Sequence, residues 1–157
     1  MRKIFITLII IILAINLFGC AHHVNSCIGT AIKPIIIRWG EYYSKNGEIR
    51  GWQLSSNLII QKYNKKSFMD SISIENFAIL PDYKFCKFVK MVQDTLIKVQ
   101  ALNVYADSMR FVEYLNTERD VNLRANWNMN FNTFLSSGFQ TVYDSLQLEL
   151  IDAKKPK

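Results

Sequence analysis

The segment Val121-Asn-Leu-Arg-Ala-Asn-Trp-Asn-Met-Asn-Phe-Asn132 decides the fold class of this chain. Apolar residues occupy every second position from Val121 to Phe131, and Asn or Arg stands at each position between them. Side chains of a β-strand point alternately to opposite faces, so this pattern predicts a strand with one buried and one solvated face. A slip of one residue would bury Asn side chains and expose Trp127, which fixes the register. Such a strand belongs to an antiparallel sheet that needs cover on one face.

Two segments have the periodicity of amphipathic helices and can supply that cover. The first begins at Pro81, because proline suits a first helical turn, and its apolar stripe is Phe85, Phe88, Val89, Val92, Leu96 and Val99. We expect the opposite side of this helix to be solvated, with Lys84, Lys87, Asp94 and Lys98. The second begins near Ser137 and Gln140, which have the spacing of a capping box. Its apolar stripe is Phe139, Val142, Tyr143, Leu146 and Leu150.

Five further strands are predicted from alternation, apolar runs and turn residues. Asn46-Gly47 marks a tight hairpin turn, since both residues tolerate the positive φ that such turns require. The predicted strands cover residues 33–39, 48–54, 58–63, 68–74 and 109–115. Strands grouped before helices indicate an α+β fold. We therefore expect an antiparallel sheet of five or six strands with two helices packed on one face, in the order ββββαββα.

Length and composition fit one small domain behind a processed leader. The predicted parts are a signal peptide (1–19), a tether (20–32), an α+β domain (33–151) and a basic tail (152–157). The 157-residue chain carries a formal net charge of +6. Without Arg2 and Lys3, 17 basic residues remain against 13 acidic ones, which leaves +4. Three of these positive charges lie in the last four residues, so we expect no nucleic-acid partner.

The leader has a basic start, Met1-Arg2-Lys3, and an apolar run from Ile4 to Phe18. The run is shorter than the ~20 residues that a helix needs to span a bilayer, and its length is typical of a secretory signal peptide. The run ends at Leu17-Phe18-Gly19-Cys20, which resembles the lipobox of bacterial lipoproteins: an aliphatic residue at −3, a small one at −1, then the cysteine. Phe18 departs from the pattern, in which −2 is usually smaller.

The lipobox resemblance implies a lipid anchor and a location. In that family the leader is cut before the cysteine, which carries acyl chains such as palmitate. Cys20 would thus hold the protein on a bilayer, since two or more acyl chains anchor stably where one is marginal. Ala21 at +2 favours the outer membrane, and the absence of an acidic cluster after Cys20 favours the periplasmic side.

The remaining cysteines and both histidines raise two further hypotheses. Cys27 and Cys86 could pair, because disulfides persist in an oxidising envelope compartment. Cys86 could equally be a small buried residue beside a helix stripe. His22, His23 and Cys27 could bind zinc or copper, but the tether offers no fourth ligand or supporting contacts, so a solvated linker is favoured.

No catalytic motif occurs in the predicted domain. Both histidines lie in the tether, and the glycines lack the spacing of a phosphate-binding loop. We therefore expect a non-enzymatic domain without a cofactor that binds an envelope protein; a carboxylate-based envelope hydrolase is the alternative. Two surfaces could bind ligands: an aromatic patch of Tyr42, Tyr43 and Trp52, and a solvated row of Asn122, Asn126, Asn128, Asn130 and Asn132 that could meet a glycan.

Overall fold

The computed structural model of the chain describes residues 34–98, 102–131 and 133–153. Its elements are β1 (Ile35–Tyr43), β2 (Glu48–Ser55), β3 (Ile59–Lys65), β4 (Ser73–Ile79), α2 (Asp82–Lys98), β5 (Ser108–Asn116), β6 (Val121–Asn128), the short 3-10 helix η1 (Phe134–Ser136) and α3 (Ser137–Ala153). The fold is α+β. Both this class and the order of four strands, helix, two strands and helix are confirmed.

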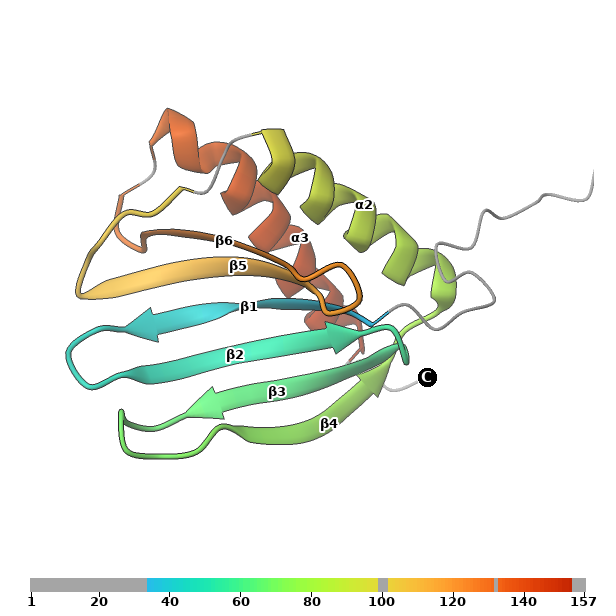
Figure 1. The fold of residues 1–157 in the computed structure, drawn as a ribbon, viewed down its shortest axis with the longest axis horizontal. Coiled ribbons are helices and arrows are strands. Elements are labelled where there is room, and N and C mark those ends of the chain that lie inside the picture. The colour runs from blue at the N-terminus through green and yellow to red at the C-terminus, as the bar shows by residue number, and fades with distance from the viewer. Residues whose placement is uncertain (1–33, 99–101, 132, 154–157) are drawn as a thin grey trace, which may run out of the picture.

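All six strands form one antiparallel sheet in the order β4-β3-β2-β1-β5-β6 (Figure 1). The first four strands follow one another as a meander. After α2 the chain returns to the opposite side of β1, so that the first strand lies in the middle of the sheet. β5 lies between β1 and β6, and it has buried residues on both faces, Val112 and Tyr114 toward the helices and Met109 and Phe111 on the opposite side.

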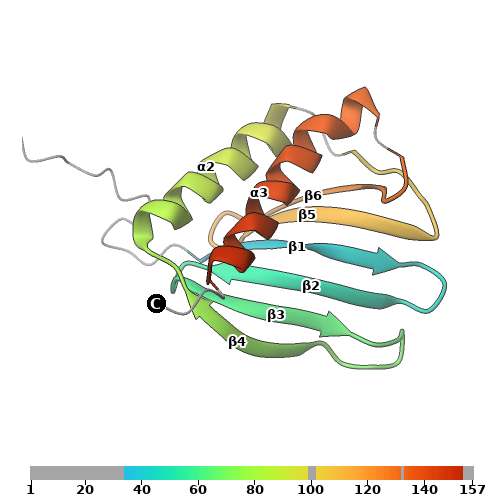
Figure 2. The same ribbon diagram turned by 180° about the vertical axis from the view of Figure 1, so that it is seen from behind.

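Both helices lie over the half of the sheet formed by β1, β5 and β6 (Figures 1 and 2). The predicted stripes are buried, with Phe85, Phe88, Val89, Val92 and Leu96 from α2 and Phe139, Val142, Tyr143, Leu146 and Leu150 from α3. Trp127 of β6 stacks on Phe139 at 6.1 Å between ring centroids and meets Tyr143 edge to face at 6.0 Å. β2, β3 and β4 lie mostly beyond this cover.

A pair of glycines brings β1 and β2 unusually close. Gly40 and Gly51 are direct partners across the two strands. A Cβ added to Gly40 would lie 2.5 Å from the carbonyl oxygen of Arg50 and 2.5 Å from Cα of Gly51. Both neighbours are backbone atoms, so only a residue without a side chain fits this approach.

The fourth strand was predicted in the wrong place. Residues 68–74 were expected to form it, but β4 runs from Ser73 to Ile79. The Ser67 hydroxyl donates to the Asp70 carboxylate at 2.7 Å, and the Asp70 amide donates to the Ser67 carbonyl, so a turn occupies the start of the predicted strand. β4 is an edge strand with polar residues on both faces, and it therefore lacks alternation.

The predicted alternating strand ends early. β6 stops at Asn128, whose side chain accepts a hydrogen bond of 2.8 Å from the Asn130 amide and so turns the backbone. Phe131 consequently lies 68% exposed instead of extending the buried face. Asn132 and the predicted stripe residue Val99 lie outside the described residues.

Two predictions about the helices are also wrong. The capping box is formed by Thr133 and Ser136 at the start of η1, not by Ser137 and Gln140. Lys84 was expected on a solvated side, but its ammonium group pairs with Glu149 of α3 and joins the two helices.

Candidate functional site

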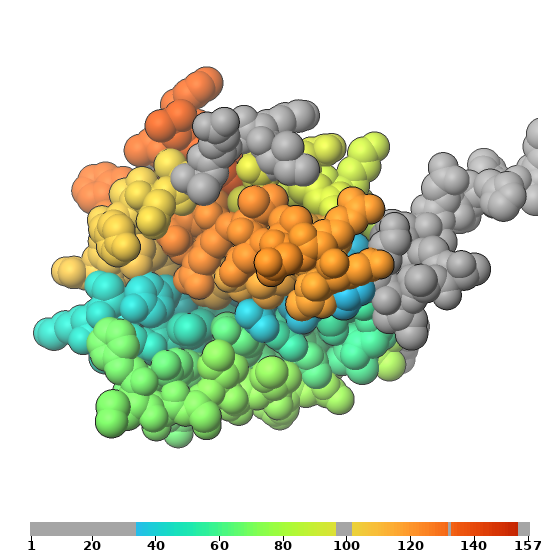
Figure 3. All heavy atoms as spheres, in the orientation of Figure 1, coloured from blue at the N-terminus to red at the C-terminus, as the bar shows by residue number. Residues whose placement is uncertain are grey.

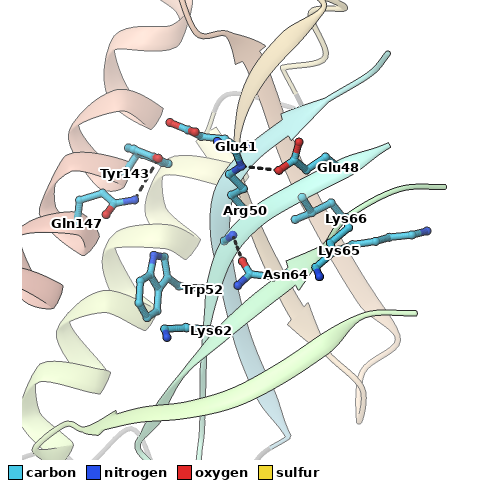
Figure 4. A pocket seen from close by; sticks show the side chains of 12 residues that line it. Glu41, Glu48, Arg50, Trp52, Lys62, Asn64, Lys65, Lys66, Tyr143 and Gln147 are labelled. Atoms are coloured by element: carbon cyan, nitrogen blue, oxygen red, sulfur yellow. Dashed lines mark hydrogen bonds and ion pairs between the residues drawn. The ribbon is translucent and has the colours of Figure 1, made fainter. Parts of the chain in front are cut away.

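A groove opens beside α3, where the helices leave the sheet uncovered (Figure 4). Its volume is about 560 Å³. β2 and β3 form its floor, and α3 forms its wall. We call it the α3 groove and define it by the lining residues Arg50, Trp52, Lys62, Asn64, Tyr143 and Gln147.

The floor becomes polar where helix cover ends. Along β2, Leu54, Trp52 and Arg50 share one face of the sheet, and they are respectively buried, half-buried and exposed. Along β3, Ile60 is buried and the next residue on that face is Lys62, which is half-buried. An apolar side chain stabilises the fold only where a neighbour shields it from water. The floor therefore carries cations where α3 no longer covers the sheet.

Trp52 separates the polar part of the groove from an apolar part. Its ring meets Phe77 of β4 edge to face, with 4.9 Å between centroids. Trp52 and Gln147 also line an adjoining hollow of about 200 Å³, which Leu150 and Ile151 complete. The two hollows together offer a polar, largely cationic surface, then an indole, then an aliphatic surface.

The charges of the groove are unevenly compensated. Arg50 pairs with Glu48, and hydrogen bonds from Arg50 and then Asn46 hold the pKa of the Glu48 carboxyl below its usual value. Lys62 pairs with Glu75 at 3.2 Å. Lys65 and Lys66 at the rim take part in no ion pair within the described residues. An anionic ligand would find two uncompensated cations there.

A carboxylate lies at the inner end of the groove. Glu41 accepts a hydrogen bond of 2.8 Å from the Tyr43 hydroxyl, and this bond raises the pKa of Tyr43. Burial, and then the charge of Glu41, raise the pKa of Tyr143, whose hydroxyl accepts a 3.1 Å hydrogen bond from Gln147. Both tyrosines therefore stay neutral at physiological pH, and Tyr143 is a polar group of the groove wall.

The predicted aromatic patch does not exist as one surface. Trp52 lies in the α3 groove, and the Tyr43 ring lies on the same face of the sheet, 5.0 Å from the Arg50 guanidinium. Tyr42 is the next residue along β1 and therefore points to the other face. Neighbours in sequence on a strand cannot share a patch, which is why the prediction failed.

Arg50, Lys62 and Gln147 were missed by the sequence prediction. The sequence did contain a sign of the groove, because the apolar alternation of β2 and β3 is interrupted. Arg50 and Lys62 stand on the strand faces that bury Leu54 and Ile60, where a covered sheet would have apolar residues.

Most other predicted site residues lie outside the described part of the chain. These are Cys20, His22, His23 and Cys27. Cys86 takes part in a disulfide, and since Cys86 is the one cysteine among the described residues, its pairing with Cys27 stays a prediction. Within residues 34–98, 102–131 and 133–153, no three His, Cys, Asp or Glu side chains gather as a metal site would require.

In the described residues, no helix has the length and apolar character needed to cross a membrane. No protein-family model matches the chain, and no curated protein matches it in sequence.

Proposed function

We propose that this chain is a lipid-anchored binding protein, and that its α3 groove holds an extended segment of an envelope protein. The segment would carry acidic side chains followed by an apolar one. The observation that carries the proposal is the order of surfaces in the groove: uncompensated lysines at the rim, Trp52 in the middle and Leu150 with Ile151 at the end.

The chemistry of these surfaces selects the ligand. Lys65 and Lys66 attract carboxylates and raise the association rate, although rim charges contribute little affinity. Trp52 is half-buried with one side open to the groove, and such aromatic anchors are the residues that dominate binding energy. An apolar side chain beside Trp52 would bury itself against the aliphatic end of α3.

The anchor rests on the lipobox resemblance of Leu17-Phe18-Gly19-Cys20. Acylated Cys20 would hold the protein on the outer membrane facing the periplasm, and the tether would place the domain above the bilayer surface. A membrane-bound partner would then be met at high effective concentration.

Selection from a library of displayed random peptides tests the groove. The full chain in detergent is the target, beside Trp52→Ala and a Lys65→Gln, Lys66→Gln double variant. We expect wild type to enrich peptides with acidic residues before a Leu or Phe. Trp52→Ala should weaken the best peptide about 30-fold, from a loss of roughly 2 kcal/mol, and the double variant should weaken it about threefold to tenfold at low salt.

The matched control is Lys87→Gln with Lys90→Gln, because both lysines are exposed on α2 and their loss changes the net charge equally. This control should bind as wild type does. Absence of enrichment, or equal enrichment by Trp52→Ala, would contradict the proposal.

One observation favours the alternative of a carboxylate hydrolase: Glu41 and Glu48 line the same groove. Glycoside hydrolysis by two carboxyl groups requires one that is protonated to serve as acid. The lowered pKa of Glu48 makes it unsuited to that role. Hydrolysis of a reporter glycoside by wild type, lost in Glu41→Gln, would nevertheless establish the enzyme and replace the binding proposal.

A further inference from the structure

One polar residue from every strand forms a straight row across the sheet. Each residue of the row is the direct partner of the next across neighbouring strands. The row consists of Asn76, Gln61, Gln53, Arg38, Glu113 and Arg124, from β4 to β6, and we call it the polar row. Since strands are roughly 4.8 Å apart, the row spans roughly 24 Å.

The polar row lies on the face opposite the helices, which is the face turned toward the viewer in Figure 3. Arg38 stands between Ile37 and Trp39, which both belong to the core under the helices, so its own side chain points the other way. Asn76 is exposed and Gln61 half-exposed, and the side chains of Arg38 and Arg124 are 24% and 36% accessible. The row is thus separate from the α3 groove.

Every pair of neighbours in the row is joined. Glu113 lies between the two arginines, with a carboxylate oxygen 3.3 Å from Nη1 of Arg38 and the other 3.8 Å from Nη1 of Arg124. On one side, Arg38 Nε donates to Gln53 at 3.2 Å, Gln53 Nε2 to Gln61 at 2.7 Å and Gln61 Nε2 to Asn76 at 2.7 Å.

A second chain of hydrogen bonds, which we call the other arm, leads away from Arg124 as the first leads away from Arg38. Arg124 Nε donates to Asn126 at 2.8 Å, and Asn126 Nδ2 donates to Asn103 at 3.2 Å. All donors therefore point away from the two guanidinium groups. Hydrogen bonds arranged in one direction polarise one another, which strengthens the donors at the ends of the arms.

The two arginines are held rigidly above aromatic rings. The Arg38 guanidinium lies 4.6 Å from the centroid of Tyr63, and that of Arg124 lies 4.4 Å from the centroid of Phe111. Stacking of this kind fixes a guanidinium group and leaves its outer N–H groups free to bind. Because the two arginine side chains are already ordered, binding a ligand costs less conformational entropy.

The unused bonding capacity of the row defines the ligand. Gln53 is buried and serves to link Arg38 to Gln61. Gln61 and Asn126 are partly accessible, and each uses one N–H and one lone pair in its hydrogen bonds, so each keeps one N–H and one lone pair for a ligand. A hydroxyl group, which donates and accepts, complements such an amide. Among the strand residues of this face Glu113 is the single acid, whereas Arg38 and Arg124 are basic and Lys65 lines the α3 groove.

We propose that the polar row binds an acidic polysaccharide, whose hydroxyl groups meet the amides and whose carboxylates meet Arg38 and Arg124. A sugar chain lying across the strands would present these oxygens along the whole row. Ile36, Ile59 and Leu115 border the row on the same face and would contact the C–H groups of the sugar rings.

The test compares three polymers on the full chain in detergent by isothermal titration calorimetry. Polygalacturonate carries hydroxyls and carboxylates, its fully methyl-esterified form carries hydroxyls without charge, and polyglutamate carries carboxylates without hydroxyls. We expect polygalacturonate to bind at least tenfold more tightly than either of the others. Equal binding of polyglutamate would show attraction of any polyanion and would overturn the proposal, as would the absence of saturable binding.

Variants place the binding on the row. Arg124→Gln should raise the Kd for polygalacturonate about tenfold, and Asn76→Ala and Gln61→Leu about threefold each, because one hydrogen bond is lost. Asn76 lies exposed on the edge strand, so its replacement leaves the core intact. The matched control is Arg50→Gln in the α3 groove, which should leave the Kd within twofold. An equal loss in Arg50→Gln would assign the sugar to the groove and contradict the proposal.

Discussion

Replacement of Gly40 by alanine should strongly destabilise the domain, because β1 and β2 meet there too closely for a Cβ. The new methyl group would lie 2.5 Å from two backbone atoms of β2. Ordinary contact between such atoms begins near 3.4 Å, so the strands must separate by nearly 1 Å. Neither neighbour is a side chain that can rotate away.

The expected loss is about 3 kcal/mol in the free energy of unfolding, at the upper end of what overpacking costs. Separation of the strands would also weaken adjacent ladder hydrogen bonds, which contribute about 1 kcal/mol each. A domain of this size has roughly 5–15 kcal/mol of stability in total, so the variant should fold but unfold at clearly lower urea concentration.

The matched control is Gly138→Ala. Gly138 is the second residue of α3, and a Cβ there meets only a methyl group of Thr95 at 3.5 Å. Alanine at this position should leave stability unchanged or raise it by up to about 1 kcal/mol. Urea unfolding followed by circular dichroism measures both variants. A loss below 0.5 kcal/mol in Gly40→Ala, with an unchanged m-value, would refute the close approach of β1 and β2.

Three further predictions concern the anchor, the disulfide and the helix pair. Intact-mass analysis of the membrane fraction should show a chain that begins at Cys20 and carries acyl mass, lost in Cys20→Ala; an unmodified wild-type chain would remove the anchor. Non-reducing peptide mapping should link Cys86 to Cys27, whereas a link to Cys20 would contradict both assignments. Lys84→Met should cost about 0.5 kcal/mol at pH 7. Glu149 raises the pKa of Lys84, so this stabilisation is complete below about pH 10.4 and is lost as pH rises through the folded-state pKa. A cost that persists at pH 12 would contradict the pairing.

Sequence patterns predicted the elements whose burial follows a simple period. The α3 stripe from Phe139 to Leu150 is buried at every predicted position, because α2, β1 and β5 pack against it. β4 was misplaced because an edge strand with Asn76 and Glu75 on opposite faces has no apolar period to detect. The end of β6 at Asn128 depends on a side-chain turn that competes with continued alternation.

The α3 groove and the polar row depend on information that no single segment contains. The groove exists because α3 covers β1 and β5 and stops short of β3, and helix placement does not follow from helix period. The row requires five strand registers at once, including the pairing of Arg38 with Glu113, 75 residues apart in sequence. The predicted row of asparagines overlaps with the observed polar network at one residue, because Asn126 accepts a hydrogen bond from Arg124 and so extends the polar row.

Photo-crosslinking in cells tests the central claim, that the α3 groove of an anchored protein holds an acidic segment of a partner. A photoreactive residue replaces Gln147, which lines the groove, and in a parallel strain replaces Leu148, which is 61% exposed outside it. Mass spectrometry then identifies the crosslinked peptide. We predict one partner from position 147 in the membrane fraction, joined through a segment with acidic residues beside an apolar one, and its absence from position 148. The same adduct from both positions, or a basic segment at 147, would contradict the account.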